Sequence, residues 1–168
     1  MSQLVGLIGP SGAGKSSVVK ILCEEYGFQY IKSFTTRLQR DADDADHIFV
    51  SKEKFGTMEA DGEFFGTIDA FDASYGLPRF TLYAPTVLLL RAPAVKLVLS
   101  QFPDAQIVEI DASIPVLKER LEKRGSSERF ESEMLEKEMA YGRTVATQVI
   151  DTSNLSPEQV AKAIIDFS

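Results

Sequence analysis

Short, almost wholly apolar runs recur along the chain. Residues 4–8, 86–90 and 105–110 contain too few polar positions for strands with one face in water. They therefore predict strands buried on both faces of a parallel sheet. Residues 28–31 and 147–150 are shorter extended segments that fit the same sheet.

Amphipathic segments follow most of these runs and predict helices. Residues 18–26, 92–100 and 132–141 are predicted helices, and another extends from an N-cap at Ser113 to Gly125, with a proline in its first turn. The tetrapeptide Ser-Pro-Glu-Gln at 156–159 reads as a capping box that opens a last helix. Strands alternating with helices predict an α/β fold, a three-layer sandwich with a central parallel sheet.

Residues 33–82 do not follow this alternation. They carry short extended pieces and a single helical segment, 52–60, so we expect a mostly irregular insertion. The length of 168 residues fits one domain. We expect a core of residues 1–32 and 84–168 with a small subregion, 33–83, inserted into it.

The composition limits the class of partner. A net charge of −7 disfavours a general nucleic-acid binder but leaves room for a small phosphorylated ligand held by a few local cations. The single cysteine, Cys23, excludes an internal disulfide and fits a reducing, cytoplasmic location. The apolar run at 4–8 is too short for a signal core or a membrane span, so no membrane partner is expected.

The turn after the first strand has the spacing of a phosphate-binding loop. Its glycines let successive N–H groups face an anion, and the following helix adds its positive N-terminal end. Lys15 is expected to reach the β- and γ-phosphates of ATP, and Ser16 to hold Mg²⁺. A glycine-rich turn with an incidental lysine is the alternative, which the flanking strand and helix disfavour. The expected nucleotide contacts are Gly9, Ser11, Gly12, Ala13, Gly14, Lys15, Ser16 and Ser17.

Further segments follow in a recognisable order. They are Ser-Phe-Thr-Thr-Arg at 33–37 with Arg40, Asp-His-Ile-Phe-Val-Ser at 46–51, Gly-Glu-Phe at 62–64, Ser-Tyr-Gly-Leu-Pro-Arg at 74–79, and 117–125. Together with the loop, they resemble the guanylate kinase family over nearly the whole chain. The resemblance implies transfer of the ATP γ-phosphate to a nucleoside monophosphate, with an acceptor-binding subregion at 33–83 and a mobile lid at about 124–132.

The resemblance implies that Ser33, Arg37, Arg40, His47 and Tyr75 bind the acceptor, with Arg37 also catalytic. Two guanidinium groups three residues apart suit bidentate contact with a phosphate. A solvated surface pair beside the acidic stretch 41–46 is the alternative for the two arginines. His47 stands where the family has tyrosine, and either phosphate contact or a strand-filling role is open.

Arg120 and Arg124 lie one turn apart at the end of the helix that leads into the lid. We expect both to be catalytic, closing over the transferring group and excluding water. The alternative is the ordinary preference of helix ends for cations. Arg129 and Arg143 are further lid candidates. Asn154 or Thr152, after the last strand, is expected to contact adenine, and a polar Asx turn is the alternative.

Some positions depart from the family pattern. Gly66 stands where the family has a glutamate that reads guanine, and Leu77 replaces a small hydroxyl residue. Leu89 and Arg91 occupy an otherwise acidic strand end near the metal. These departures leave open a phosphorylated-sugar kinase, as in the related ribose 1,5-bisphosphate phosphokinases, or a non-catalytic binding domain. A monomer and a homodimer are both compatible with the sequence.

Overall fold

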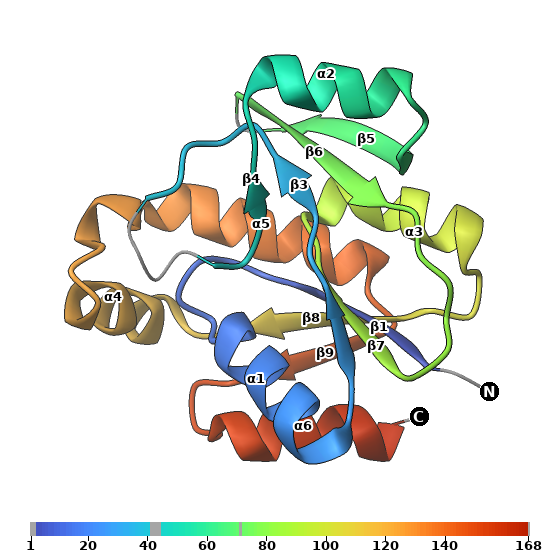
Figure 1. Cartoon of the computed structure of the whole chain (residues 1–168). Helices are drawn as coiled ribbons and strands as arrows, with labels where there is room; N and C mark the ends of the chain where they lie inside the picture. Colours follow the sequence, from blue (N-terminus) through green and yellow to red (C-terminus); the bar gives the residue numbers. More distant parts are fainter. Residues whose placement is uncertain (1–2, 41–44, 71, 168) are drawn as a thin grey trace.

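The central element is a five-stranded parallel sheet in the order β2-β7-β1-β8-β9 (Figure 1). The computed structural model describes residues 3–40, 45–70 and 72–167. The side chains of the three middle strands are buried almost throughout, as the apolar runs predict. The strands are β1 (Leu4–Ile8), β2 (Gln29–Ile31), β7 (Thr86–Leu89), β8 (Gln106–Asp111) and β9 (Gln148–Asp151).

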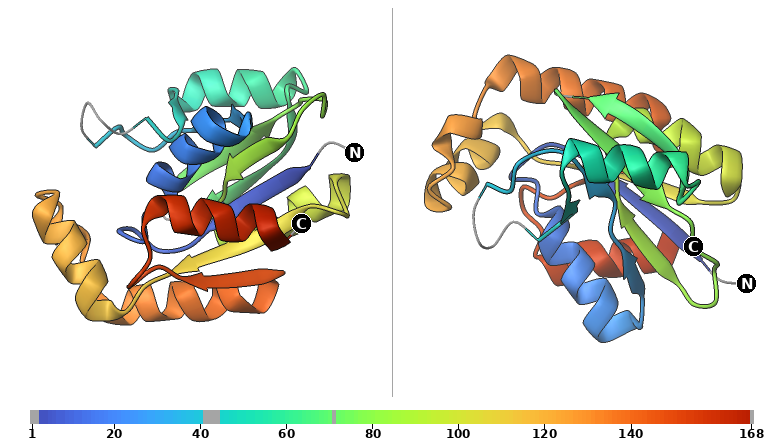
Figure 2. Two further views of the ribbon diagram at one scale, coloured as in Figure 1. Left: turned by 90° about the horizontal axis from the view of Figure 1, so that it is seen from below. Right: turned by 45° about the horizontal axis from the view of Figure 1, so that its top comes forward.

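Helices cover both faces of this sheet, so the predicted three-layer α/β sandwich is confirmed. One face carries α1 (Lys15–Tyr26) and α6 (Pro157–Phe167), which contact each other, and the other carries α3 (Val95–Gln101) and α5 (Ser132–Val145) (Figures 1 and 2). The capping box at α6 forms as expected: the Ser156 amide donates to Gln159 Oε1 at 2.8 Å, and the Gln159 amide donates to Ser156 Oγ at 3.2 Å.

The connection from β8 to α5 runs through α4 (Ile114–Lys123) and a short 3-10 turn, η2 (Ser127–Arg129). A second 3-10 turn, η1 (Ala92–Ala94), precedes α3. Gly125 adopts φ +67° immediately after Arg124, the C-cap of α4, as a helix-ending glycine does. This path brings the predicted lid segment to the end of the sheet where β1 leads into α1.

The insertion is more regular than the sequence predicts. It forms a second sheet in the order β4-β3-β6-β5, covered by α2 (Lys52–Ala60) through Phe55 and Met58 (Figure 1). The antiparallel β5–β6 pair was missed because an irregularity between Phe64 and Gly66 interrupts the two-residue period. The strands are β3 (Phe34–Thr35), β4 (Ile48–Phe49), β5 (Phe64–Ala70) and β6 (Ala73–Pro78).

The second sheet stands beside the end of the central sheet at which β1 and β7 finish (Figures 1 and 2). Ligands of open parallel sheets bind beyond the carboxyl ends of the strands. Among the helices of the described ranges, none combines the length and apolar character needed to cross a bilayer.

Candidate active site

The loop between β1 and α1 depends on glycine at specific positions. Gly9, Gly12 and Gly14 have φ values of +143°, +86° and +95°, which side-chain-bearing residues rarely adopt. A Cβ atom at Gly9 would also overlap the carbonyl oxygen of Ile110 on β8. The loop therefore passes close against the neighbouring strand, and α1 begins directly after it at Lys15.

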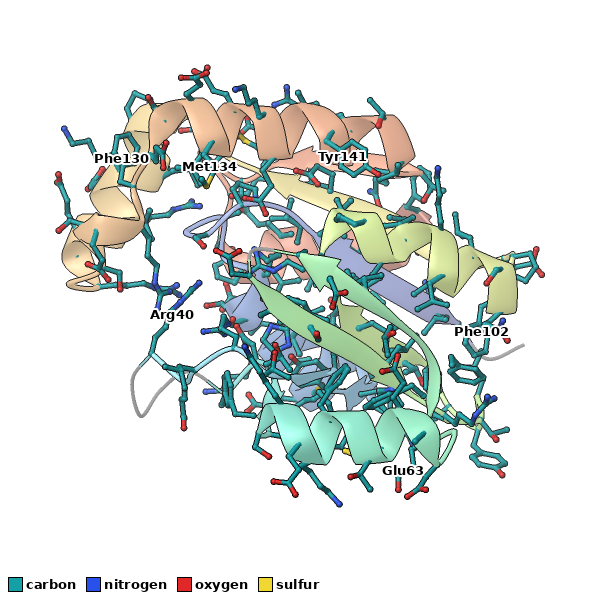
Figure 3. The ribbon with its side chains drawn as sticks, turned by 90° about the horizontal axis from the view of Figure 1, so that it is seen from above. Arg40, Glu63, Phe102, Phe130, Met134 and Tyr141 are labelled. Carbon is teal, nitrogen blue, oxygen red and sulfur yellow. The ribbon has the colours of Figure 1, made fainter. Side chains whose placement is uncertain are left out.

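A cavity with a large excess of positive charge opens at this loop; we call it the cationic cavity. Loop residues, the insertion, the end of β7 and the lid segment all contribute to its wall. Figure 3 shows Arg40 extending from the insertion toward the segment between α4 and α5. Such a concentration of cations favours a ligand with several negative charges. Its cationic lining residues are Lys15, Arg37, Arg40, Arg91, Arg124 and Arg129.

Lys15 is held by the loop itself. Its Nζ donates to the carbonyl oxygens of Gly9 at 2.7 Å and Pro10 at 2.8 Å. The pKa of Lys15 is lowered to about 8, chiefly by burial; the nearby Glu138 acts in the opposite direction, and Arg91 acts in the same direction as burial. An anion entering the cavity would stabilise the ammonium form and compete for its hydrogen bonds.

Ser16 is joined to an acidic residue that the sequence analysis assigned no role. Its hydroxyl lies 2.9 Å and 2.7 Å from the two carboxylate oxygens of Asp46. Tyr30 on β2 donates its hydroxyl to the Asp46 carbonyl oxygen at 2.7 Å. Asp46 lines the cationic cavity beside His47. The only signal in the sequence was its place in the segment 46–51.

Three of the five predicted acceptor residues line this cavity, whereas Ser33 and Tyr75 do not. Arg37, Arg40 and His47 line it, and the guanidinium of Arg37 lies 5.1 Å from the Phe49 ring centroid. Ser33 is buried and is not among the lining residues. Residues 41–44, most of the acidic stretch invoked as the alternative setting for the arginine pair, lie outside the described residues.

Tyr75 lies behind the cavity wall. Its side chain is buried, and its hydroxyl has no hydrogen-bond partner among the described residues. Its ring packs against His47 with centroids 5.5 Å apart, and the Arg91 guanidinium lies 5.7 Å from its centroid. An unsatisfied buried hydroxyl beside two cavity-lining side chains suits contact with a ligand oxygen.

The arginines expected at the lid separate into different places. Arg124 and Arg129 line the cationic cavity, but Arg120 does not. Arg120 instead donates to the Gly12 and Ala13 carbonyl oxygens at 3.3 Å, and to Thr152 Oγ1 at 3.0 Å and its carbonyl oxygen at 2.9 Å. These four bonds tie the loop to Thr152, the residue after β9, and hold Arg120 away from the cationic cavity.

Arg143 is also placed away from the cationic cavity. It forms an ion pair with the buried Asp111 on β8, in which its Nε donates to Asp111 Oδ2 at 2.6 Å. Arg91, by contrast, lines the cavity and pairs with Glu138 of α5 at 3.6 Å. The strand-end arginine therefore connects the cavity wall to the helix that follows the lid segment.

A second cavity lies on the other side of the loop. It shares Gly12, Gly14 and Arg124 with the cationic cavity and adds apolar surface from Val18, Leu155, Pro157 and Val160. Arg120 and Thr152 line it, whereas the exposed Asn154 does not. Of the two residues expected near adenine, the structure brings only Thr152 to this cavity. Ser17 and Ala13 complete its contact with the loop.

Two of the positions that depart from the family pattern, Gly66 and Leu77, are closely packed against neighbouring side chains. A Cβ at Gly66 would come within 2.6 Å of the Leu97 side chain on α3. Leu77 is 4% exposed and belongs to the apolar cluster that includes Leu88 and Val98. Neither position presents a polar group that can recognise the edge of a base.

Glu109 on β8 is a buried acid that the sequence analysis missed. Its side chain is fully buried, and a Cβ at Gly142 of α5 would overlap its carboxyl group. Burial and the neighbouring Asp111 raise the pKa of Glu109 to about 9, although Lys15 acts in the opposite direction. This shift favours the neutral, protonated form of the Glu109 carboxyl. The sequence carried one signal of this burial, since Glu109 lies within the run 105–110 that predicts a strand buried on both faces.

The sequence and the fold both resemble characterised kinases. A family model described as "Guanylate kinase" matches residues 1–156. The chain is 32% identical over 133 residues to guanylate kinase of Symbiobacterium thermophilum, covering 73% of this chain and 63% of that protein. It is 31% identical over 130 residues to ribose 1,5-bisphosphate phosphokinase PhnN of Rhizobium etli, covering 73% and 66%. The chain thus spans less than two thirds of each of these relatives.

The similarity extends to a solved structure. Guanylate kinase from Anaplasma phagocytophilum superposes with a TM-score of 0.72 over 99% of this chain and 84% of that one, at 21% identity. At this level of identity, the comparison supports the fold.

Proposed function

Since this chain belongs to the guanylate kinase family, we propose that it transfers the γ-phosphate of ATP to a nucleoside monophosphate. The observation that carries this proposal is that Lys15 of the loop and Arg37 and Arg40 of the insertion line the same cavity. A donor phosphate and an acceptor phosphate bound by these two groups would lie next to each other. Phosphoryl transfer requires chiefly this alignment, together with charge neutralisation.

Each part of the site has a role in this proposal. The loop and Lys15 hold the β- and γ-phosphates, while Arg37, Arg40 and Tyr75 hold the acceptor phosphate. The subregion 33–83 binds the acceptor, and the lid at 124–132 brings Arg124 and Arg129 over the transferring group. The second cavity receives the nucleoside of ATP, with Arg120 fixing the loop between the two sites.

The residues at the loop also fit Mg²⁺, which the family implies. Magnesium prefers oxygen ligands, and Ser16 Oγ lies on the cavity wall beside the expected position of the phosphates. Bound there, the ion would neutralise charge on the β- and γ-phosphates.

A phosphorylated sugar is a second candidate acceptor. It is favoured by the packing of Leu97 against Gly66 and the burial of Leu77, which leave no group to read guanine at these positions. An acceptor without a base needs no such group. The similarity to the phosphokinase of R. etli points to the same class.

A coupled assay of ADP release distinguishes these candidates. The acceptors are GMP, dGMP, AMP, CMP, UMP, dTMP and ribose 1,5-bisphosphate. We expect release that depends on at least one of the nucleoside monophosphates. Turnover with ribose 1,5-bisphosphate but with none of the nucleoside monophosphates would support the phosphorylated-sugar kinase instead. The absence of turnover with every acceptor would contradict both candidate functions.

A substitution at Gly66 tests the base-reading position. We expect Gly66→Glu alone to lower the melting temperature, because its Cβ meets Leu97, and to give no preference for GMP. In a Leu97→Ala background, the glutamate has room, and we expect a smaller loss of stability. Differential scanning fluorimetry and kcat/KM for GMP and AMP are the measurements.

Gly56→Glu on α2 is the matched control, because a Cβ there meets no atom within 4 Å. We expect it to leave the melting temperature unchanged or slightly higher. If Gly66→Glu is as harmless as this control, the position is not closed by Leu97.

A further inference from the structure

The end of β7 gives no carboxylate to a metal bound at the loop. Leu89, Leu90 and Arg91 line the cationic cavity at this point, and none of them carries an acidic oxygen. Magnesium in nucleotide sites is commonly held by one or two carboxylates together with phosphate oxygens and water. A carboxylate from another element would fill this role.

Asp46 has the position that the role requires. Its two carboxylate oxygens lie 2.9 Å and 2.7 Å from Ser16 Oγ. Adjacent ligands of an octahedral magnesium ion, each at 2.0–2.1 Å, are about 2.9 Å apart. The two groups form a hydrogen bond at this distance, and the same spacing is compatible with neighbouring ligands of one ion, or with a ligand and the acceptor of a metal-bound water.

Asp46 is also anchored to the core, and it brings negative charge to a lining that is otherwise cationic or neutral. The hydrogen bond from Tyr30 on β2 to the Asp46 carbonyl oxygen anchors the residue to the central sheet. Of the described residues that line the cationic cavity, Asp46 alone is acidic, facing six cationic side chains. The described residues contain no group of three acidic, histidine or cysteine side chains placed to hold a metal ion.

We infer that Asp46 is the acidic magnesium partner of this enzyme, acting with Ser16 in place of the missing carboxylate at the end of β7. This inference rests on the proposed kinase function. Because Asp46 belongs to the insertion and precedes His47, the metal site is shared between the core and the acceptor-binding subregion. Metal binding and the position of the acceptor site are therefore coupled.

The test compares Asp46→Asn with wild type by Mn²⁺ binding, observed by electron paramagnetic resonance, in the presence of the non-hydrolysable β,γ-imido analogue of ATP. We expect Asp46→Asn to weaken Mn²⁺ binding to the nucleotide complex by about tenfold or more. Affinity for the analogue in EDTA should stay the same or rise, because a negative charge beside the phosphates has been removed. Asp69→Asn is the control, since Asp69 also accepts from a serine hydroxyl, that of Ser74 at 2.6 Å, but lies outside the cavity.

The outcomes separate this inference from the proposed function. Wild-type Mn²⁺ affinity in Asp46→Asn would overturn the metal role while leaving the kinase proposal intact. If Asp46→Asn raises the affinity for the analogue equally with and without metal, the metal role is also overturned. Asp46 would then act only by holding the Ser16 hydroxyl through a hydrogen bond. Failure of the wild-type protein to bind the analogue under any condition would instead contradict the proposed function.

Discussion

Replacing Lys15 with methionine is expected to lower turnover by about a hundred- to a thousandfold while leaving the fold intact. The lysine ammonium is the loop's own positive side chain in the cationic cavity, where it can stabilise the negative charge that shifts toward the leaving phosphate oxygens in the transition state. Methionine has a similar length but carries no charge. The measurement is kcat for ADP release at saturating ATP and acceptor.

Stability should not fall in this variant. Burial lowers the pKa of Lys15 to about 8, which means that the folded protein disfavours the charged amine. Removing it should leave the free energy of unfolding unchanged or higher. The matched control is Lys20→Met, an exposed lysine on the same helix paired with Glu24, for which we expect wild-type turnover. Near-normal turnover in Lys15→Met would exclude the loop as the phosphoryl site.

Glu109 is expected to make the protein less stable as the pH rises from about 5 to 9. Its pKa is raised to about 9 in the folded state, from an ordinary value of 4.5. Between these values the unfolded chain has released the proton that the folded chain retains. The stabilisation present below pH 4.5 is therefore progressively lost, by up to about 1.4 kcal/mol for each pH unit, until the folded carboxyl itself ionises.

Glu109→Gln should remove this dependence, because the amide is neutral throughout and similar in shape to the protonated acid. Urea unfolding at pH 5.5, 6.5 and 7.5 measures it, in a range below the pKa of Lys15 at about 8. Glu25→Gln, an exposed position on α1, is the control and should keep the wild-type slope. Identical slopes in wild type and Glu109→Gln would show that Glu109 is ionised in the folded protein.

The central sheet and the loop were predictable because their signals are local. Apolar runs such as 4–8 are long enough to identify buried strands, and the spacing of Gly9, Gly14 and Lys15 identifies the loop between strand and helix. The β5–β6 hairpin was not predictable in this way, since its irregularity near Gly66 breaks the alternation that marks a strand.

The site itself was predictable only in part, because side chains meet there through the tertiary path. Arg120 and Arg124 have the spacing of one helix face, yet Arg120 meets the loop carbonyls and Arg124 reaches the cationic cavity. Asp46 and Glu109 are two of 25 acidic residues; the segment 46–51 and the apolar run 105–110 mark their places in the chain but not the side chains that they meet. Their importance arises from the approach of the insertion to Ser16 and of α5 to β8.

The most direct measurement is a titration of wild type and Lys15→Met with the β,γ-imido analogue of ATP, followed through the backbone amide resonances of Gly12, Gly14 and Ser16. We expect saturable shifts centred on these amides in the wild type, and at least tenfold weaker binding in the variant. Saturation of the wild type with no response at the loop amides, or no binding at all, would contradict the account.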